Sequence, residues 1–416
     1  MSTQPNCDDY DPNSLLMEEA LIRIEQTVTP VSGKENVSVT DALARVLAED
    51  VLSPINVPAY TNSAMDGYAV SKNEIPKTGS KQLKVIAKVF AGHPFSQKIG
   101  RGECVKIMTG AAMPADVDTV IMQEHVTVEG DHIIIQAGHK PEQNVRHAGE
   151  DLAKGGVAIA TGKNITPADI GLIASLGIPH ISVYRKVKVA FFSTGDELKS
   201  LGDTLAAGQI YDSNRYTIAA MLRKLGLEII DLGIIPDNRE LIQKAFDEAA
   251  KNADVVITTG GVSVGEADFV KEMLEKLGEV NFWKIAMKPG RPLTFGRIQN
   301  TIFFGLPGNP VSAMVTFYQF VQPALHKIMG QSTISPTTIK LNCASKLKKS
   351  PGRVEFQRGI IFKTENHEWQ VKSSGHQGSH ILSSMSQANC FIKLPLEKGN
   401  IEIGEEVEVQ PFAGLL

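Results

Sequence analysis

The stretch DVVITTGGVSVGEADFVKEMLEKLG, residues 254–278, contains three signals that decide the fold of the central part of the chain. It begins with an apolar, β-branched run, which predicts a buried strand over residues 254–261. Glycines then interrupt the run, and residues 267–278 carry apolar side chains at helical spacing, which predicts a helix. A strand that enters a helix through a glycine-rich turn is the building unit of parallel α/β sheets.

The same strand-and-helix unit recurs between about residues 184 and 330. The predicted strands are residues 186–195, 228–237, 254–261 and 300–308, and the predicted helices are residues 215–226, 238–253, 267–278 and 310–330. Apolar strands that alternate with amphipathic helices indicate a doubly wound, mostly parallel sheet with helices on both faces. Ligands of such sheets bind beyond the carboxyl ends of the strands.

Outside this region, short alternating runs separated by Gly and Pro predict β-structure. We therefore expect an α/β multidomain protein with four parts. These are a helical, linking part (residues 13–50 and 148–183), a β-rich lobe (51–147), the α/β domain (184–333) and a small, barrel-like C-terminal β-domain (334–416).

The composition narrows the class of protein. The 416 residues carry a net charge of -4, which gives no overall attraction to nucleic acid or to an anionic membrane, so we expect neither as a partner. No apolar run reaches the roughly 18 residues that span a bilayer, and the N-terminus lacks the pattern of a secretory signal, so we expect a cytoplasmic protein. The scattered cysteines predict reduced structural thiols; they are Cys7, Cys104, Cys343 and Cys390.

The glycine-rich loop resembles an anion cradle but carries acids. Gly260, Gly261 and Gly265 would let backbone N–H groups approach a ligand closely, and the helix that follows adds partial positive charge at its N-terminus. Glu266 and Asp268 lie at the start of that helix, where a capping role is the simplest explanation. If an anion binds, these carboxylates repel it unless a cation such as Mg²⁺ lies between them.

Other predicted strand ends are polar as well. Asp196 and Glu197 lie at the carboxyl end of the first strand of the α/β domain, and Asp237 lies at the end of the second. Pro307 and Pro310 lie in the turn at the end of the fourth strand, where Pro310 suits the first turn of the helix that follows. Ser213 or Asn214 is expected to cap the helix over residues 215–226. Turns and caps explain each loop alone, but several polar loops at one sheet edge favour a binding site.

Cationic residues lie close together in residues 282–296. Lys284, Lys288 and Arg291 flank a Pro-Gly turn, where solvated surface lysines would be unremarkable by themselves. Beside an anion-binding edge, they favour contacts with phosphate or another oxyanion.

The β-rich lobe contains three non-periodic, polar stretches, residues 56–70, 107–114 and 144–152. Their candidate site residues are Asp66, Thr109, Arg146 and Asp151. Salt bridges and turns could explain each stretch, but not why such loops occur in two separate lobes.

The motifs NVPAYTNSAMDGYAV, IMTGAAMP, NVRHAGEDL, STGDEL, GQIYDSN, TTGGVSVGEADF, MKPGRPLTFG and FGLPGNPVSA occur in an order that resembles the molybdopterin molybdenumtransferases, a family that includes the C-terminal domain of gephyrin. The resemblance implies a homodimer whose active site is shared between the α/β domain of one subunit and the lobe of the other. It implies Mg²⁺-dependent insertion of molybdate into adenylylated molybdopterin, with release of AMP. Molybdopterin adenylyltransferase and other proteins of the cofactor pathway are the implied protein partners.

Carried over by motif, the resemblance implies catalytic roles for Asp66, Glu197, Asp237, Asp268, Lys284 and Lys288, with Glu197, Asp237 and Asp268 around the metal. The implied contacts to cofactor are Thr109, Arg146, Asp151, Ser193, Gly195, Gly260, Gly261, Ser263, Gly265, Arg291, Pro307 and Pro310. The segment around Ser379 matches the family too loosely to imply a role.

Two alternatives remain. The adenylyltransferase that makes the adenylylated intermediate resembles the α/β domain alone, whereas about 180 residues precede that domain here and a β-domain follows it. A non-catalytic molybdopterin-binding scaffold or carrier is the second alternative, although every charged position of the implied site is retained. Formation of adenylylated molybdopterin from ATP, or binding without AMP release, would identify these alternatives.

Overall fold

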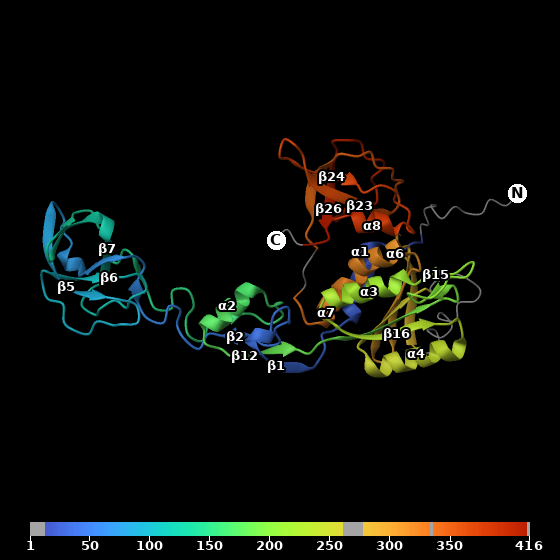
Figure 1. The fold of residues 1–416 in the computed structure, drawn as a ribbon, viewed down its shortest axis with the longest axis horizontal. Coiled ribbons are helices and arrows are strands. Elements are labelled where there is room, and N and C mark those ends of the chain that lie inside the picture. Colours follow the sequence, from blue (N-terminus) through green and yellow to red (C-terminus); the bar gives the residue numbers. More distant parts are fainter. Residues whose placement is uncertain (1–12, 261–277, 333–335, 414–416) are drawn as a thin grey trace.

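The computed structural model describes residues 13–260, 278–332 and 336–413. The molecule is elongated, with the β-rich lobe at one end, the linking part in the middle, and the α/β domain beside the C-terminal β-domain at the other end (Figure 1). The predicted fold class, an α/β multidomain protein with a lobe, a linking segment and a small C-terminal barrel, is confirmed. No helix of the described residues is long and apolar enough to cross a membrane.

The α/β domain is built on a six-stranded sheet. In spatial order its strands are β16 (Glu228–Ile235), β13 (Lys188–Thr194), β17 (Val255–Thr259), β21 (Thr301–Leu306), β20 (Pro292–Ile298) and β18 (Gly278–Lys284). The first four are mutually parallel and correspond to the four predicted strands. β20 pairs antiparallel with β21 and with β18. These two strands, β20 and β18, are not among the predicted strands. The predicted helix over residues 267–278 lies almost entirely outside the described residues.

Alternate residues of β13 face opposite sides of this sheet, as a pleated strand requires. Phe191 packs in the hydrophobic cluster that contains α3 (Ser213–Lys224) and α1 (Met17–Thr27). Phe192 packs in a second cluster against α4 (Arg239–Asn252), with its ring 5.2 Å from that of Phe246. Burying each phenylalanine stabilises the fold by about 1.5–3 kcal/mol. The central sheet is therefore rigid, and residues at its edge are held in fixed positions.

Two predicted helices differ in detail from those in the structure. The cap of α3 is Asp212, whose side chain accepts a hydrogen bond from Arg215 N, so the expected caps Ser213 and Asn214 are wrong by one or two positions. All three residue types cap helices well, and the sequence alone does not rank them. The predicted helix over residues 310–330 forms as α6 (Pro310–Thr316), a π-helical segment η4 (Phe317–Val321) and α7 (Gln322–Ile328).

The β-rich lobe is a curled six-stranded sheet. Its spatial order is β7 (Thr119–Met122), β4 (Gly67–Val70), β6 (Glu103–Ile107), β5 (Ser80–Val89), β9 (His132–Gln136) and β8 (Val126–Glu129). The short pair β3 (Asn62–Ser63) and β10 (Val145–Arg146) joins the lobe to its connections. Both sheet faces bury apolar side chains, which makes the lobe a body with its own core.

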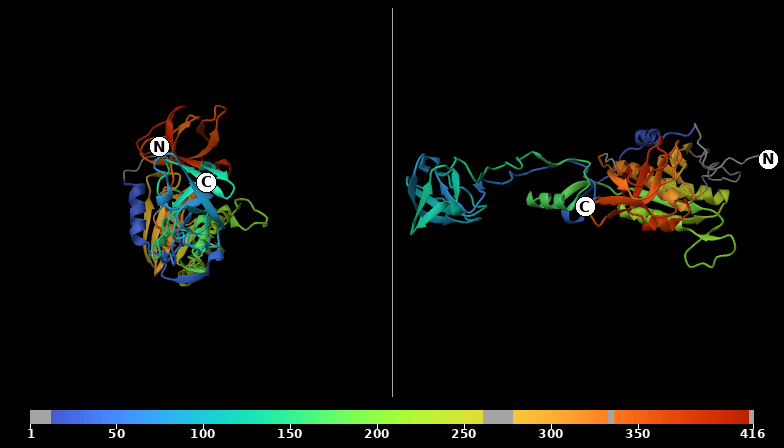
Figure 2. Two further views of the ribbon diagram at one scale, coloured as in Figure 1. Left: turned by 90° about the vertical axis from the view of Figure 1, so that its left-hand side faces the viewer. Right: turned by 90° about the horizontal axis from the view of Figure 1, so that it is seen from above.

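The linking part connects the lobe to the α/β domain through two neighbouring extended segments (Figure 2). They are tied by the pair β2 (Val51–Leu52) and β11 (Val157–Ile159) and by the bridge between Val57 and Leu152. Nearby lie the pair β1 (Lys34–Ser38) and β12 (His180–Tyr184) and the helix α2 (Pro167–Ser175). Thr166 and Asp169 form a capping box at the start of α2, which satisfies two of its free N–H groups.

The C-terminal β-domain is a closed barrel of five strands. Around the ring they are β23 (Val354–Lys363), β24 (Trp369–Ser373), β22 (Ile339–Cys343), β26 (Glu406–Pro411) and β25 (Cys390–Leu394), and β25 pairs again with β23. The two-residue strand β19 (Met287–Lys288) of the α/β domain pairs in parallel with β23 and so attaches the barrel to the sheet edge. The helix α8 (Leu382–Gln387) packs between the barrel and α6.

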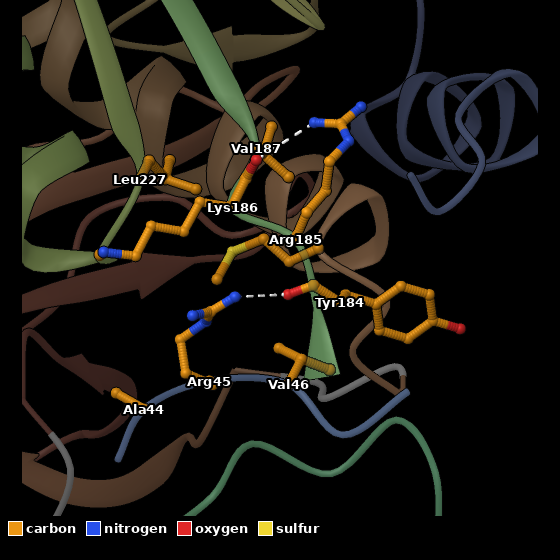
Figure 3. A pocket seen from close by; sticks show the side chains of 10 residues that line it. Ala44, Arg45, Val46, Tyr184, Arg185, Lys186, Val187 and Leu227 are labelled. Carbon is orange, nitrogen blue, oxygen red and sulfur yellow. Dashed lines mark hydrogen bonds between the residues drawn. The ribbon is translucent and has the colours of Figure 1, made fainter. Parts of the chain in front are cut away.

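The joint between the linking part and the α/β domain contains a small cavity. Figure 3 shows Arg45 donating a hydrogen bond to the carbonyl oxygen of Tyr184, at 2.8 Å, and Arg185 donating to that of Lys186. Arg185 also forms two hydrogen bonds of 2.7 Å with Asp254. The cavity has a volume of about 20 Å³, room for about one water molecule. This joint is therefore structural and too small to bind a substrate.

Candidate functional site

The carboxyl edge of the central sheet and the C-terminal barrel enclose a pocket of about 1120 Å³. From the α/β domain, its wall includes the end of β17, the loop between β18 and β20, and the start of α6. From the barrel, it includes β23 and the segment that precedes α8. The lining residues are Gly260, Lys284, Met287, Lys288, Pro289, Gly290, Arg291, Pro292, Pro307, Gly308, Asn309, Ser312, Lys346, Leu347, Lys348, Arg353, Glu355, Phe356, Gln357, Arg358, Ser373, Gly375, His376, Gln377, Gly378 and Ser379.

The sheet topology explains why the predicted cationic residues meet here. β18 runs parallel to β21, because each is antiparallel to β20 between them. Lys284 at the end of β18 therefore lies at the same edge as Pro307, which follows β21. Lys288 and Arg291 line the pocket from the loop between β18 and β20, so the structure brings together all three of the predicted cations.

Two glycines at this edge of the sheet allow neighbouring backbone and side-chain atoms to lie close to their Cα atoms. Gly260 has a φ of +85°, and a Cβ there would lie 2.5 Å from the carbonyl oxygen of Thr194. Gly195 has a φ of +145°, and a Cβ there would lie 2.6 Å from Oε2 of Glu197. Side chains would therefore separate the ends of β13 and β17 and displace the Glu197 carboxylate.

Three acids lie at the other end of the same edge, beyond β13 and β16. The backbone N–H of Asp237 donates a hydrogen bond of 3.2 Å to Oδ1 of Asp196. Burial raises the pKa of Asp237, and the negative charges of Asp196 and Glu197 raise it further. The edge is therefore polarised, with cations at the β18–β20 end and carboxylates at the β13–β16 end.

Carboxylate oxygens are the ligands that Mg²⁺ prefers. Within residues 13–260, 278–332 and 336–413, however, no group of three or more His, Cys, Asp or Glu side chains is arranged to hold a metal ion. The expected metal ligand Asp268 lies outside the described residues, as do Gly261, Ser263 and Gly265.

The remaining predicted residues of the α/β domain lie either beneath the sheet edge or between the pocket and the start of α6. Ser193 is fully buried and its hydroxyl lies 2.8 Å from that of Thr259, so it lies beneath the edge. Pro307 lines the pocket, and Pro310 is the first residue of α6. The N–H of Val311 donates to the carbonyl oxygen of Ser379, at 3.1 Å, which joins the start of α6 to the barrel.

Three of the four remaining predicted residues, Asp66, Thr109 and Arg146, belong to the lobe, which lies at the opposite end of the molecule from the α/β domain and the barrel (Figure 1). Asp66 Oδ1 accepts hydrogen bonds from the N–H and the hydroxyl of Thr109, at 2.7 and 2.8 Å. These two bonds hold the pKa of the Asp66 carboxyl below its usual value. Arg146 is exposed on β10, whose partner β3 is also bonded to residues 110–111, so it belongs to the same end of the lobe. Asp151 is exposed farther along, in the connecting segment.

Sequence reasoning missed the barrel's contribution. Arg358 is 1% exposed, and its guanidinium donates to Ser384 Oγ and to the carbonyl oxygens of His376 and Gly378, at 3.0–3.2 Å. Burial lowers the pKa of Arg358 to about 10, and no carboxylate of the described residues forms an ion pair with it. A buried cation whose neighbours are neutral favours the binding of an anion in the adjoining pocket.

Comparisons with known proteins agree along the whole chain. Family models described as "MoeA N-terminal region (domain I and II)", "Probable molybdopterin binding domain" and "MoeA C-terminal region (domain IV)" match residues 15–177, 190–327 and 340–412. A molybdopterin molybdenumtransferase of Haemophilus influenzae is 48% identical over 97% of this chain and 100% of its own length. Gephyrin of Dictyostelium discoideum is 33% identical over 95% of this chain and 62% of its own length.

A crystal structure of a molybdopterin biosynthesis protein from Pyrococcus horikoshii OT3 is 28% identical, with a TM-score of 0.83, and covers 96% of this chain and 100% of that one. The order of motifs, the polarised sheet edge and these full-length similarities have one explanation. The chain belongs to the molybdopterin molybdenumtransferase family of transferases of molybdenum cofactor biosynthesis.

Proposed function

We propose that this protein inserts molybdate into adenylylated molybdopterin, with Mg²⁺, and releases AMP and the molybdenum cofactor. The observation that carries the proposal is the cationic pocket between the sheet edge and the barrel, which shares its edge with the acids beyond β13 and β16. Molybdate is a dianion and requires concentrated positive charge, which Lys284, Lys288 and Arg291 supply together with Arg358.

The acids fit the opposite end of an adenylylated substrate. Glu197 and Asp237, with Asp268, would hold Mg²⁺ through hard oxygen ligands. The raised pKa of Asp237 supports this assignment, because a divalent cation would relieve the repulsion among the carboxylates. When bound, the ion would neutralise charge on the phosphates of the substrate.

The chain's own residues would then position the two reactants. Backbone N–H groups near Gly260 and the pocket cations hold the phosphates and molybdate, so that hydrolysis of the phosphoanhydride by one water molecule, which releases AMP, occurs beside the dithiolene that takes up the metal oxyanion. The barrel closes one side of the pocket and limits access of bulk water.

A second copy would complete the site. Asp66, Thr109 and Arg146 belong to the lobe and Asp151 to its connection, and the lobe lies at the opposite end of the molecule from the α/β domain and the barrel (Figure 1), so these residues act at the pocket only if the lobe of a partner subunit docks beside it. We therefore propose a homodimer with shared active sites, acting in the cytoplasm downstream of a molybdopterin adenylyltransferase.

The test is molybdate-dependent AMP release from purified protein supplied with adenylylated molybdopterin and Mg²⁺. We expect AMP release to require molybdate and to fall at least about 100-fold in Lys288→Gln, because one charge of the oxyanion pocket is lost. Tight binding of adenylylated molybdopterin without AMP release would favour a carrier. Formation of adenylylated molybdopterin from ATP would favour the adenylyltransferase.

A further inference from the structure

The pocket that we assign to the oxyanion contains a carboxylate. Its cationic lining residues are Lys284, Lys288, Arg291, Lys346, Lys348, Arg353 and Arg358. Among the described lining residues the one acidic side chain is Glu355. An acid in this position opposes the binding of any anion, so its presence requires an explanation.

Glu355 is held in place by the fold. It lies on β23, is 5% exposed, and stands opposite Lys288 in the parallel pairing of β19 with β23. The ammonium of Lys288 lies 3.9 Å from Oε1 of Glu355. The side-chain amide of Gln357 donates to Oε2 of Glu355, at 3.0 Å, and to the carbonyl oxygen of Lys348, at 2.9 Å.

Charge compensation in the pocket is therefore uneven. Lys288 has a buried carboxylate beside it, whereas Arg358, three residues beyond Glu355 on the same strand, donates to neutral oxygens. A buried carboxylate is retained where a cation stabilises it, and it holds that cation in one position. An oxyanion that enters must compete with Glu355 for Lys288.

We propose that Glu355 is a positioning and specificity-determining residue, which holds Lys288 in the empty pocket and limits the pocket's affinity for oxyanions. This inference rests on the proposed function only in that the pocket binds molybdate. The new element is that Glu355 keeps the pocket's affinity for molybdate below the affinity that the pocket cations alone would give. A pocket that binds molybdate less tightly favours transfer of the metal oxyanion to the dithiolene over its retention by the protein.

The experiment is isothermal titration of the full-length protein with sodium molybdate. Glu355→Gln keeps the size and the hydrogen-bonding groups of the side chain but removes its charge. We expect the Kd for molybdate to fall about tenfold, since both the repulsion and the neutralisation of Lys288 are lost. The apparent KM for molybdate in AMP release should fall in parallel, a change that a purely structural role would not produce.

The matched control is Glu402→Gln. Glu402 pairs with another pocket-lining lysine, Lys346, at 2.8 Å, but both side chains are mostly exposed. Because exposed pairs are screened by water, we expect this change to alter the Kd for molybdate less than about twofold.

A double-mutant cycle tests the route through Lys288. In a Lys288→Gln background, Glu355→Gln should tighten molybdate binding by less than about threefold, because the cation that Glu355 neutralises is already gone. Equal effects in both backgrounds would overturn the role of Lys288.

The inference fails if folded Glu355→Gln, with an unchanged Tm, binds molybdate as tightly as the wild type or more weakly. If the wild-type protein itself does not bind molybdate, the proposed function fails as well. The first result leaves wild-type binding intact, so the two failures are distinguishable.

Discussion

Asp237 has an unfavourable electrostatic environment. Burial and the charges of Asp196 and Glu197 raise its pKa, so the folded protein binds a proton at this site more readily than the unfolded chain. A raised carboxyl pKa lowers stability as pH rises from the unfolded pKa through the folded pKa, and the loss is complete above the folded value. At neutral pH, Asp237 therefore destabilises the protein without its ligand.

We predict that Asp237→Asn raises the Tm at pH 7.5 by at most about 1 °C, since water screens the repulsion at this exposed side chain, and lowers the rate of AMP release at least about 100-fold. As the pH falls below the ordinary carboxyl pKa, Asp237 becomes protonated in the folded and the unfolded chain, and the difference in Tm should shrink. Scanning calorimetry at pH 7.5 and at lower pH, with the AMP assay, measures both effects. A lower Tm at pH 7.5 would contradict the assigned repulsion.

At the scale of single residues, the sequence allows several pocket-lining residues near strand ends to be named. Pro307 could be named because strand ends of a parallel sheet meet at one edge, and Lys284 and Lys288 because they lie close together around a Pro-Gly turn. Arg358 and Glu355 could not, because local periodicity does not indicate that β23 pairs with β19, about 65 residues earlier. The site is therefore predictable where it depends on chain order and not where it depends on distant pairing.

At the scale of elements, an ion pair joins the segment after β12 to the start of a central strand. Arg185, directly after β12, forms two hydrogen bonds with Asp254, directly before β17. Although burial opposes ionisation of Asp254, the bonds from Arg185 and from Lys188 N hold its pKa below the usual value. A lowered carboxyl pKa gives stability that is present above the unfolded pKa and lost as pH falls through the folded pKa.

We predict that Asp254→Asn lowers stability at pH 7 by about 1–2 kcal/mol, since Arg185 loses a charged partner. The difference from the wild type should shrink as the pH approaches 3. Urea unfolding across this range measures the effect, with Glu228→Gln as control, because its pair with Lys188 is exposed. An effect of Asp254→Asn that is independent of pH would exclude an ionic role for this pair.

At the scale of the molecule, the predicted residues fall into two groups, with Asp66 at the lobe and Lys288 at the pocket, at opposite ends of the chain (Figure 1). Sequence reasoning predicts the parts well, because each has its own hydrophobic pattern, but it does not predict their separation. The distance between the groups makes a shared site in a homodimer testable without a structure of the dimer.

We predict that Asp66→Asn and Lys288→Gln are each nearly inactive, and that a mixture allowed to exchange subunits regains activity. Random exchange of a two-fold dimer gives one intact site in each mixed pair, or about a quarter of all sites. AMP release before and after exchange measures this recovery. Two Asp66→Asn preparations treated identically are the control, and absence of recovery from proven mixed dimers would exclude a shared site.

The attachment of β19 to β23 has a mechanical consequence. Lys288 belongs to the α/β domain by its place in the chain, but its backbone is hydrogen-bonded to the barrel, whereas Lys284 ends a strand of the central sheet. If the barrel rotates against the sheet, Lys288 travels with the barrel and Lys284 stays behind. A change in the angle between barrel and sheet would therefore change the distance between the two lysines.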